Sequence, residues 1–136
     1  MNVFEEVRKL RLPLGKYLVL GSGILAALGI REAKDLDLLV TEDIFDRLRN
    51  EGWKYEEIVI ENRVRQKLTT DGTEVFKDFW YGSESPKTGD LIAGAQVIDG
   101  IPFLSLQKLA EIKRIMGREK DQKDILLIED YFAKVK

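Results

Sequence analysis

Two aspartates separated by one residue stand in an otherwise apolar segment, with Asp35 and Asp37 on either side of Leu36. Side chains alternate between the two faces of a strand, so both carboxylates point to one face while Leu36 and Leu38 point to the other. Two neighbouring acids repel each other unless a positive charge lies between them, and a divalent cation with oxygen ligands, above all Mg²⁺, meets that need. The pattern therefore predicts a carboxylate metal site. The alternative is a pair of solvated acids at the beginning of a strand.

A glycine turn, Gly21-Ser22-Gly23, precedes this pair and lies between a predicted strand and a predicted helix. Such a turn presents backbone N–H groups to a phosphate, its glycines allow close approach, and Ser22 adds a hydroxyl donor. The same residues also fit the dinucleotide-binding pattern G-x-G-x-x-A. In that motif, however, the acid closes the second strand after a longer helix, whereas here the apolar strand continues past the acids. We therefore prefer a phosphate site that works together with Asp35 and Asp37.

A third acid, Asp78, lies within a predicted strand over residues 73–81, where it shares one face with Glu74 and Trp80. A lone carboxylate inside an apolar strand is costly without a partner. Asp78 is thus a candidate for a third site carboxylate, and Trp80 is a candidate for stacking on a base. The alternative is an edge strand whose Asp78 pairs with a lysine.

The composition excludes several classes of chemistry. The 136 residues are 44% hydrophobic and 34% charged, which excludes a disordered chain and a membrane protein. A net charge of −2 gives no positive field that would bind the nucleic-acid backbone non-specifically. The sequence has no Cys and no His, so disulfides, thiolate metal sites, the Ser-His-Asp triad and the usual zinc sites are excluded. Any catalysis must use carboxylates, Lys, Arg, Ser, Thr or Tyr, with or without a hard metal ion.

The elements that must position these residues follow from the hydrophobic pattern. It predicts helices over residues 3–12, 24–30, 44–51, 105–116 and 121–133. It predicts strands over residues 16–20, 36–40, 54–60, 63–68 and 73–81, with short extended pieces near 91–92, 96–98 and 101–103. This order indicates an α/β (α+β) fold, a mixed β-sheet flanked by helices, with a C-terminal helical pair. We expect a single domain over residues 1–136, with its core at about 16–104 and the helical pair at about 105–134.

The spacing of these residues resembles the nucleotidyltransferase superfamily related to DNA polymerase beta, particularly its small prokaryotic members. The family pattern is an apolar residue, Gly-Ser or Gly-Gly, a spacer of about ten residues, and then Asp-apolar-Asp/Glu-apolar. Residues 20–22 and 35–38 match these two elements and are separated by residues 23–34. Asp78 matches the third acid of the pattern, although Lys77 precedes it where the family has an apolar residue. A related uncharacterised or toxin-associated group is similar at residues 28–31 and in the tail Arg-x-Lys-Asp-x-x-Asp at 118–124.

This resemblance implies transfer of a nucleoside monophosphate from a nucleoside triphosphate (NTP) to an acceptor. Asp35, Asp37 and Asp78 would be the catalytic and metal-binding residues, with two Mg²⁺ ions held by the first two and one of them shared by Asp78. Gly21 and Ser22 would hold the β- and γ-phosphates. The acceptor (a small molecule, a protein or an RNA end) is left open, as is the choice of NTP.

Four basic residues are candidates for binding the nucleotide. Arg31 lies between the glycine turn and the acids, while Lys113, Arg118 and Lys120 surround the break between the last two helices. The alternatives are a helix cap for Arg31 and solvated surface pairs for the others.

A second function class is an inactive nucleotide-binding or regulatory module, of the kind that forms one half of a toxin–antitoxin-like pair. We expect a cytoplasmic protein without membrane contact, and a homodimer or a partner protein is part of the same expectation.

Overall fold

The computed structural model describes residues 1–135, which form one seven-stranded mixed sheet with helices on both of its faces. The strands are β1 (Tyr17–Val19), β2 (Leu36–Val40), β3 (Lys54–Ile60), β4 (Arg63–Thr70), β5 (Thr73–Phe76), β6 (Gln96–Ile98) and β7 (Ile101–Phe103). The helices are α1 (Val3–Lys9), α2 (Gly23–Ala27), α3 (Glu42–Asn50), α4 (Thr88–Ala93), α5 (Leu106–Met116) and α6 (Glu119–Lys134). The expected mixed sheet with a C-terminal helical pair is confirmed.

The strand that carries the aspartate pair lies in the middle of the sheet, whose order is β3-β4-β5-β2-β1-β7-β6. β2 pairs antiparallel with β1 and parallel with β5, so it has a partner on both sides. Its apolar side chains are fully buried, as expected for a central strand covered on both faces. Asp37 therefore comes from one of the most securely held strands of the molecule.

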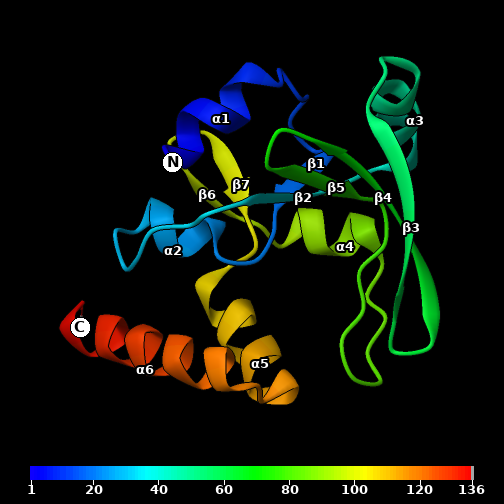
Figure 1. Ribbon diagram of the computed structural model, residues 1–136. Coiled ribbons are helices and arrows are strands. Elements are labelled where there is room, and N and C mark those ends of the chain that lie inside the picture. The colour runs from blue at the N-terminus through cyan, green and yellow to red at the C-terminus, as the bar shows by residue number, and fades with distance from the viewer. Residues whose placement is uncertain (136) are drawn as a thin grey trace.

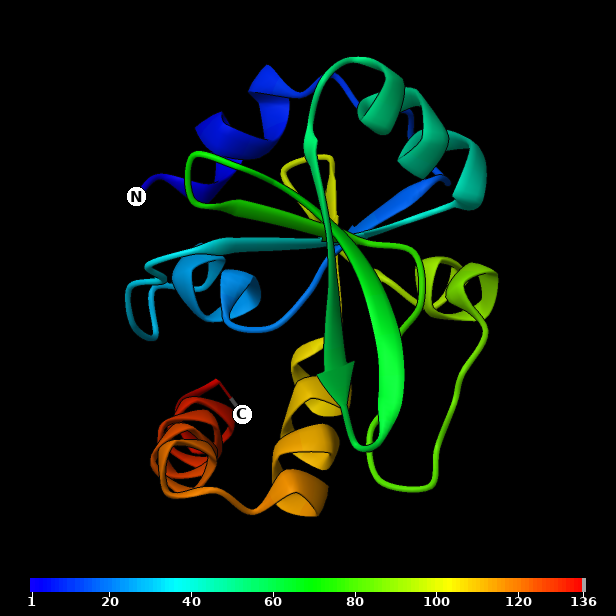
Figure 2. The ribbon, with the colours of Figure 1, turned by 45° about the vertical axis from the view of Figure 1, so that its right-hand side comes forward.

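The helices are divided between the two faces of the sheet (Figures 1 and 2). Helices α1, α2 and α3 lie on one side, with α1 packed against α2, whereas α4 and the α5–α6 pair lie on the other. The β3–β4 hairpin extends past the body of the sheet to the level of α5 in both views. The second side of the sheet is thus bordered by the hairpin, by the turn before α2 and by the helical pair. No helix of residues 1–135 is long and apolar enough to cross a membrane.

The sequence provides caps at the beginning of α5 and at the junction of α5 and α6. The Ser105 hydroxyl accepts a hydrogen bond from the Lys108 backbone N–H at 3.1 Å, which fixes the first turn of α5. Gly117 ends α5 in the left-handed conformation, with φ of 62°, which glycine adopts without steric cost. Arg118 and Asp121 then form the capping arrangement that begins α6. These signals explain why the pair is predictable from the sequence.

Two predicted elements are wrong. Residues 91–92, expected as an extended piece, belong to helix α4. The strand expected over residues 73–81 ends at Phe76. Phe76 is the last residue of β5 to pair with a neighbour, opposite Leu39 of β2 and Lys67 of β4, and the chain leaves the sheet there although both neighbouring strands continue.

Candidate functional site

Asp37 lies against the glycine turn that follows β1. The Leu20 backbone N–H donates to the Asp37 carbonyl oxygen at 2.8 Å, which brings the turn alongside β2. Gly21 has φ of 58°, and a Cβ built there would lie 3.7 Å from Asp37 Oδ2. The Ser22 side chain makes no capping hydrogen bond with α2, so its hydroxyl is free to bind a ligand. The fold thus places the predicted glycine turn beside the second predicted aspartate.

Gly23 has a packing role in this turn. A Cβ at Gly23 would lie 2.4 Å from Val19 Cγ1, far inside van der Waals contact. Only glycine therefore lets α2 pack this closely on β1, whatever the turn binds.

A carboxylate that the sequence analysis did not select, Glu74, stands next to Asp37. The two residues are direct partners across the parallel β2–β5 pair, so their side chains project from the same face. Burial, reinforced by repulsion from Glu74 and Asp35, raises the pKa of Asp37 from 3.8 to about 6. Asp37 is therefore a carboxylate whose negative charge is unfavourable until a cation approaches it.

Glu74 is itself held by a lysine of the neighbouring strand. Lys67 Nζ lies 3.1 Å from Glu74 Oε1 and 3.6 Å from Glu56 Oε2, and only 13% of the Lys67 side chain is exposed. Although burial opposes its charge, hydrogen bonding to Glu74 leaves the pKa of Lys67 above its ordinary value. A ligand or metal ion that used Glu74 would compete with this contact.

The other two predicted acids are more exposed. Asp35 directly precedes β2 and is exposed. Asp78 lies beyond the end of β5 and is exposed, and its backbone carbonyl accepts a hydrogen bond of 3.2 Å from Arg65 Nε. The alternation that would have put Asp78 on the face of Glu74 is absent because the strand has ended. The structure therefore brings Asp35, Asp37 and Glu74 to one region and leaves Asp78 outside it.

The donor set suits Mg²⁺ in part. Carboxylate oxygens are the ligands this ion prefers, and a cation would relieve the repulsion that Asp37 experiences. Within residues 1–135, however, no three acidic side chains are gathered closely enough to hold a metal ion by themselves. Mg²⁺ commonly takes one or two carboxylates and completes its shell with water and substrate phosphates. The residues present fit that arrangement and do not form a closed protein cage.

Two hollows meet at Asp37, and we name them by their linings. The apolar hollow, of about 390 Å³, lies between the hairpin, β5 and α5, and its walls include Ile58, Ile60, Phe76, Trp80, Leu109 and Ile112. The basic hollow, of about 510 Å³, is lined by Ser22, Arg31, Lys113, Arg118, Lys120 and Lys123, with Asp124 and Leu127. Asp37, Lys113, Arg118 and Lys120 line both hollows. A carboxylate and three cations thus surround the place where the two hollows join.

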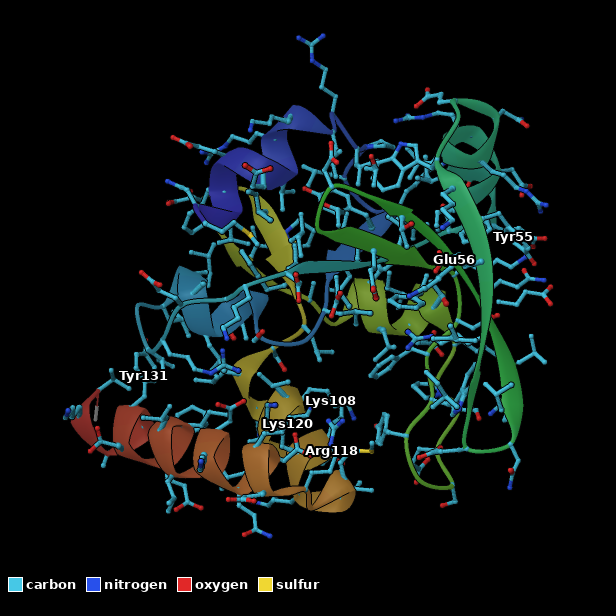
Figure 3. The ribbon with its side chains drawn as sticks, in the orientation of Figure 1. Tyr55, Glu56, Lys108, Arg118, Lys120 and Tyr131 are labelled. Atoms are coloured by element: carbon cyan, nitrogen blue, oxygen red, sulfur yellow. The ribbon has the colours of Figure 1, made fainter. Side chains whose placement is uncertain are left out.

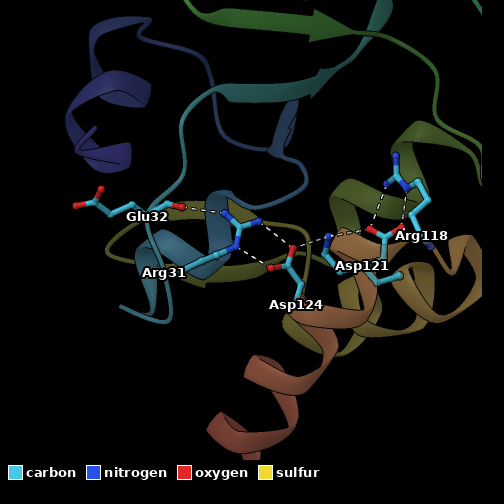
Figure 4. A network of polar contacts seen from close by, with 6 residues as sticks. Arg31, Glu32, Arg118, Asp121 and Asp124 are labelled. Atoms are coloured by element: carbon cyan, nitrogen blue, oxygen red, sulfur yellow. Dashed lines mark hydrogen bonds and ion pairs between the residues drawn. The ribbon is translucent and has the colours of Figure 1, made fainter.

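Three of the predicted basic residues are held by buried acids of α6 (Figure 4). Arg31 donates from Nε and Nη2 to the two carboxylate oxygens of Asp124, at 2.7 and 2.8 Å. Lys113 Nζ lies 2.9 Å from Asp124 Oδ2 and 3.3 Å from Asp121 Oδ1. Arg118 Nε donates to Asp121 Oδ2 at 2.6 Å. The result is one continuous ionic network from the segment after α2 to the junction of α5 and α6.

This network is buried on its acidic side. The Asp121 side chain is fully buried and that of Asp124 is 8% exposed, whereas half of the Arg118 side chain is exposed. Burial opposes ionisation of both acids, but hydrogen bonds from Arg118, Lys113 and Arg31 hold their pKa values below the ordinary value. The acids therefore stay charged and keep the cations oriented along the wall of the basic hollow.

Lys120 differs from the other three predicted basic residues. It lies in the first turn of α6, between Arg118 and Asp121 in the sequence (Figure 3). Within residues 1–135 it makes no ion pair. Its charge is available to a ligand without breaking a protein contact.

The residues that sequence reasoning missed carried weak signals. Glu74 shares its strand face with Phe76, as the alternation predicts, but spacing alone does not distinguish it from a solvated acid beside the turn at residues 71–72. Asp121 and Asp124 were part of the tail motif, yet nothing in the sequence says that they are buried or that they hold Arg31. That contact joins residues 93 positions apart.

Comparison with solved structures finds a likeness in fold. The chain is similar to the crystal structure titled "ANT(2")-Ia in complex with adenylyl-2"-tobramycin", with 15% sequence identity and a TM-score of 0.49. The superposition covers 96% of this chain and 86% of that one. No protein-family model matches the sequence. No curated protein matches it either.

Proposed function

We propose that this chain is a Mg²⁺-dependent nucleotidyltransferase that moves a nucleoside monophosphate from an NTP to an acceptor hydroxyl or phosphate. The observation that supports it best is the position of Asp37, which lines both hollows in the company of Lys113, Arg118 and Lys120. A triphosphate needs cations along its length and a carboxylate-held metal at the reacting phosphorus. The junction of the two hollows offers both.

The basic hollow is suited to the triphosphate. Its cations are oriented by Asp121 and Asp124, so they lose little freedom when a ligand binds. Lys120, which makes no ion pair within residues 1–135, and the hydroxyl of Ser22 complete the donors on this side. Gly21 leaves room for a phosphate next to Asp37.

Asp35 and Asp37 would hold two Mg²⁺ ions, and we propose Glu74 as the third carboxylate in preference to Asp78. When bound, the ions would neutralise the charge of the triphosphate and of the transferred group. Glu74 is favoured because it is in register with Asp37 and lines the same hollow, whereas Asp78 is exposed beyond the strand.

The proposed transfer forms one bond at the α-phosphorus and breaks another. The acceptor oxygen forms a bond to the α-phosphorus while the bond between that phosphorus and the α–β bridging oxygen breaks. Pyrophosphate leaves with the electron pair of the broken bond, stabilised by Lys113, Arg118 and Lys120. The acceptor proton passes to Glu74, the third carboxylate, which lines the apolar hollow beside Asp37.

Calorimetric titration with each of the four NTPs tests this proposal, with and without Mg²⁺. We expect metal-dependent binding to one or more NTPs in the wild type and its loss in the Asp35→Asn/Asp37→Asn double variant. The matched control is Asp46→Asn, which removes an exposed carboxylate on α3, remote from both hollows. Absence of binding to every NTP at millimolar concentration would refute the proposal.

The second candidate is an inactive nucleotide-binding module, of the regulatory kind found in toxin–antitoxin-like pairs. It is favoured by the contact between Lys67 and Glu74, which occupies the third carboxylate, and by the lack of a three-acid cluster within residues 1–135. Pyrophosphate release separates the two candidates. A chain that binds an NTP with Mg²⁺ but releases no pyrophosphate with any acceptor tested is a binding module.

A further inference from the structure

The apolar hollow contains a cation that the proposed reaction does not use. Arg65 on β4 lines the hollow together with Phe76, Phe79 and Trp80. Its guanidinium lies 3.6 Å from the centre of the Phe76 ring and 5.5 and 5.7 Å from the rings of Phe79 and Trp80. Three aromatic side chains thus fix the position of this charge.

Arg65 has no carboxylate bound to it. Within residues 1–135 it forms no ion pair, and its one hydrogen bond runs from Nε to the backbone carbonyl of Asp78. Its Nη2 is buried without a partner, and so is the indole Nε1 of Trp80. Burial lowers the pKa of Arg65 to about 10, against the attraction of Asp37, Asp78 and Glu74. An arginine charge in an apolar hollow is unfavourable until an anion binds to it.

The shape and lining of the hollow limit what can bind there. The walls are aliphatic and aromatic on the sides of the hairpin and α5, so a flat or aliphatic body gains contact area. The charged residues of the lining are four cations (Arg65, Lys113, Arg118 and Lys120) and three acids (Asp37, Glu74 and Asp121). The resulting net charge of +1 favours one anionic group over a polycationic ligand. Both observations favour a small organic anion over a neutral or cationic molecule.

We propose that the apolar hollow binds the acceptor, and that the acceptor is a small organic acid with a flat apolar body. Its acid group binds Arg65 and its hydroxyl lies toward Asp37 at the junction with the basic hollow. The identity of the bound molecule as an acceptor rests on the proposed function. Binding of the acid does not, because it requires only Arg65 and the aromatic walls.

Three probes with one body and three charges test the proposal: 4-hydroxyphenylacetate, its neutral amide 4-hydroxyphenylacetamide, and the cationic amine tyramine. Binding is followed through the indole N–H resonance of Trp80 in two-dimensional ¹H–¹⁵N spectra, with EDTA present and no nucleotide. The resonance is identified with a Trp53→Phe variant, since the chain has two tryptophans. The experiment thus reports both affinity and place of binding.

We expect the acid to bind about tenfold more tightly than the amide, with tyramine weakest, because one charge-assisted contact distinguishes the first two. Arg65→Gln should abolish the preference for the acid, and Arg65→Lys should keep part of it if the Gln variant does not fold. Arg114→Gln is the matched control. It removes the same charge from α5, which borders the hollow, but the Arg114 side chain is 54% exposed and does not line the hollow.

Equal affinity for acid and amide, an unchanged preference in Arg65→Gln, or no movement of the Trp80 resonance with any probe would each overturn the proposal. Binding of the acid in a protein that binds no NTP with Mg²⁺ would instead refute the proposed function and leave the hollow as an acid-binding site.

Discussion

Neutralising Asp37 should stabilise the protein when no divalent cation is present. The pKa of Asp37 is raised from 3.8 to about 6 by burial and by repulsion from Glu74 and Asp35. Each pKa unit corresponds to about 1.4 kcal/mol, so the charged side chain lowers the free energy of unfolding by roughly 3 kcal/mol at pH 8. Asp37→Asn keeps the shape of the side chain and removes the charge. The variant should therefore be more stable than the wild type by up to that amount.

The sign of the pH dependence follows from the direction of the shift. A group whose pKa is raised by folding contributes stability that is complete below its unfolded-state pKa and is lost as the pH rises through the folded-state value. The advantage of Asp37→Asn should thus be small near pH 4, about half of its full size near pH 5, and constant above about pH 7. Addition of Mg²⁺ should reduce the advantage, because the cation stabilises the wild-type carboxylate.

Urea unfolding at pH 5 and pH 8 in EDTA measures both differences. Asp46→Asn serves as the control, because an exposed carboxylate of α3 should change the stability by less than about 0.5 kcal/mol. A destabilised Asp37→Asn at pH 8 would show that the carboxylate makes a favourable contact in the folded protein. That result would refute the inference that the ionised Asp37 side chain destabilises the folded protein when no cation is bound.

Three further predictions concern other parts of the site. Gly23→Ala should lower the free energy of unfolding by about 1–3 kcal/mol through its clash with the Val19 side chain, and Val19→Ala in the same chain should restore part of the loss; thermal unfolding measures both. Asp124→Asn should destabilise the protein by roughly 2–4 kcal/mol at pH 7. That difference should fall as the pH drops below about 4, because the Asp124 pKa is lowered by folding; equal stability at pH 7 would contradict the network. Glu74→Gln should weaken Mg²⁺-dependent NTP binding more than Asp78→Asn does, as calorimetry can determine, and the reverse order would restore Asp78 as the third carboxylate.

Local patterns in the sequence were enough to predict most elements. The apolar run of β2, the turn at residues 71–72 and the caps of α5 each determine structure over a few neighbouring residues. The prediction of an extended piece at residues 91–92 is wrong because two apolar residues fit a short helix as well as a strand. The strand β5 ends at Phe76 although the apolar pattern runs on to Trp80, because Phe79 and Trp80 line the apolar hollow instead of continuing the sheet, and that is a property of the assembled fold.

The site was predictable only in part for the same reason. The aspartate pair and the glycine turn are close in sequence, and their juxtaposition follows from one β-α-β connection. The partnership of Asp37 with Glu74 depends on strand register, which spacing along the chain does not reveal. The engagement of Arg31 by Asp124 depends on how α6 packs against the rest of the molecule.

The two sides of the site belong to parts of the fold that should open at different free energies. The carboxylate side stands on β2, the central strand, where amide hydrogens should exchange only on global unfolding. The cationic side stands on the helical pair, which joins the remainder of the molecule in part through the Arg31–Asp124 ion pair. Transient undocking of α5 and α6 from the sheet would remove the phosphate-binding cations of these helices and leave the aspartates in place. Ligand affinity would then depend on the local stability of the C-terminal helices. Solution conditions that favour their local unfolding would abolish ligand binding while the sheet stays folded.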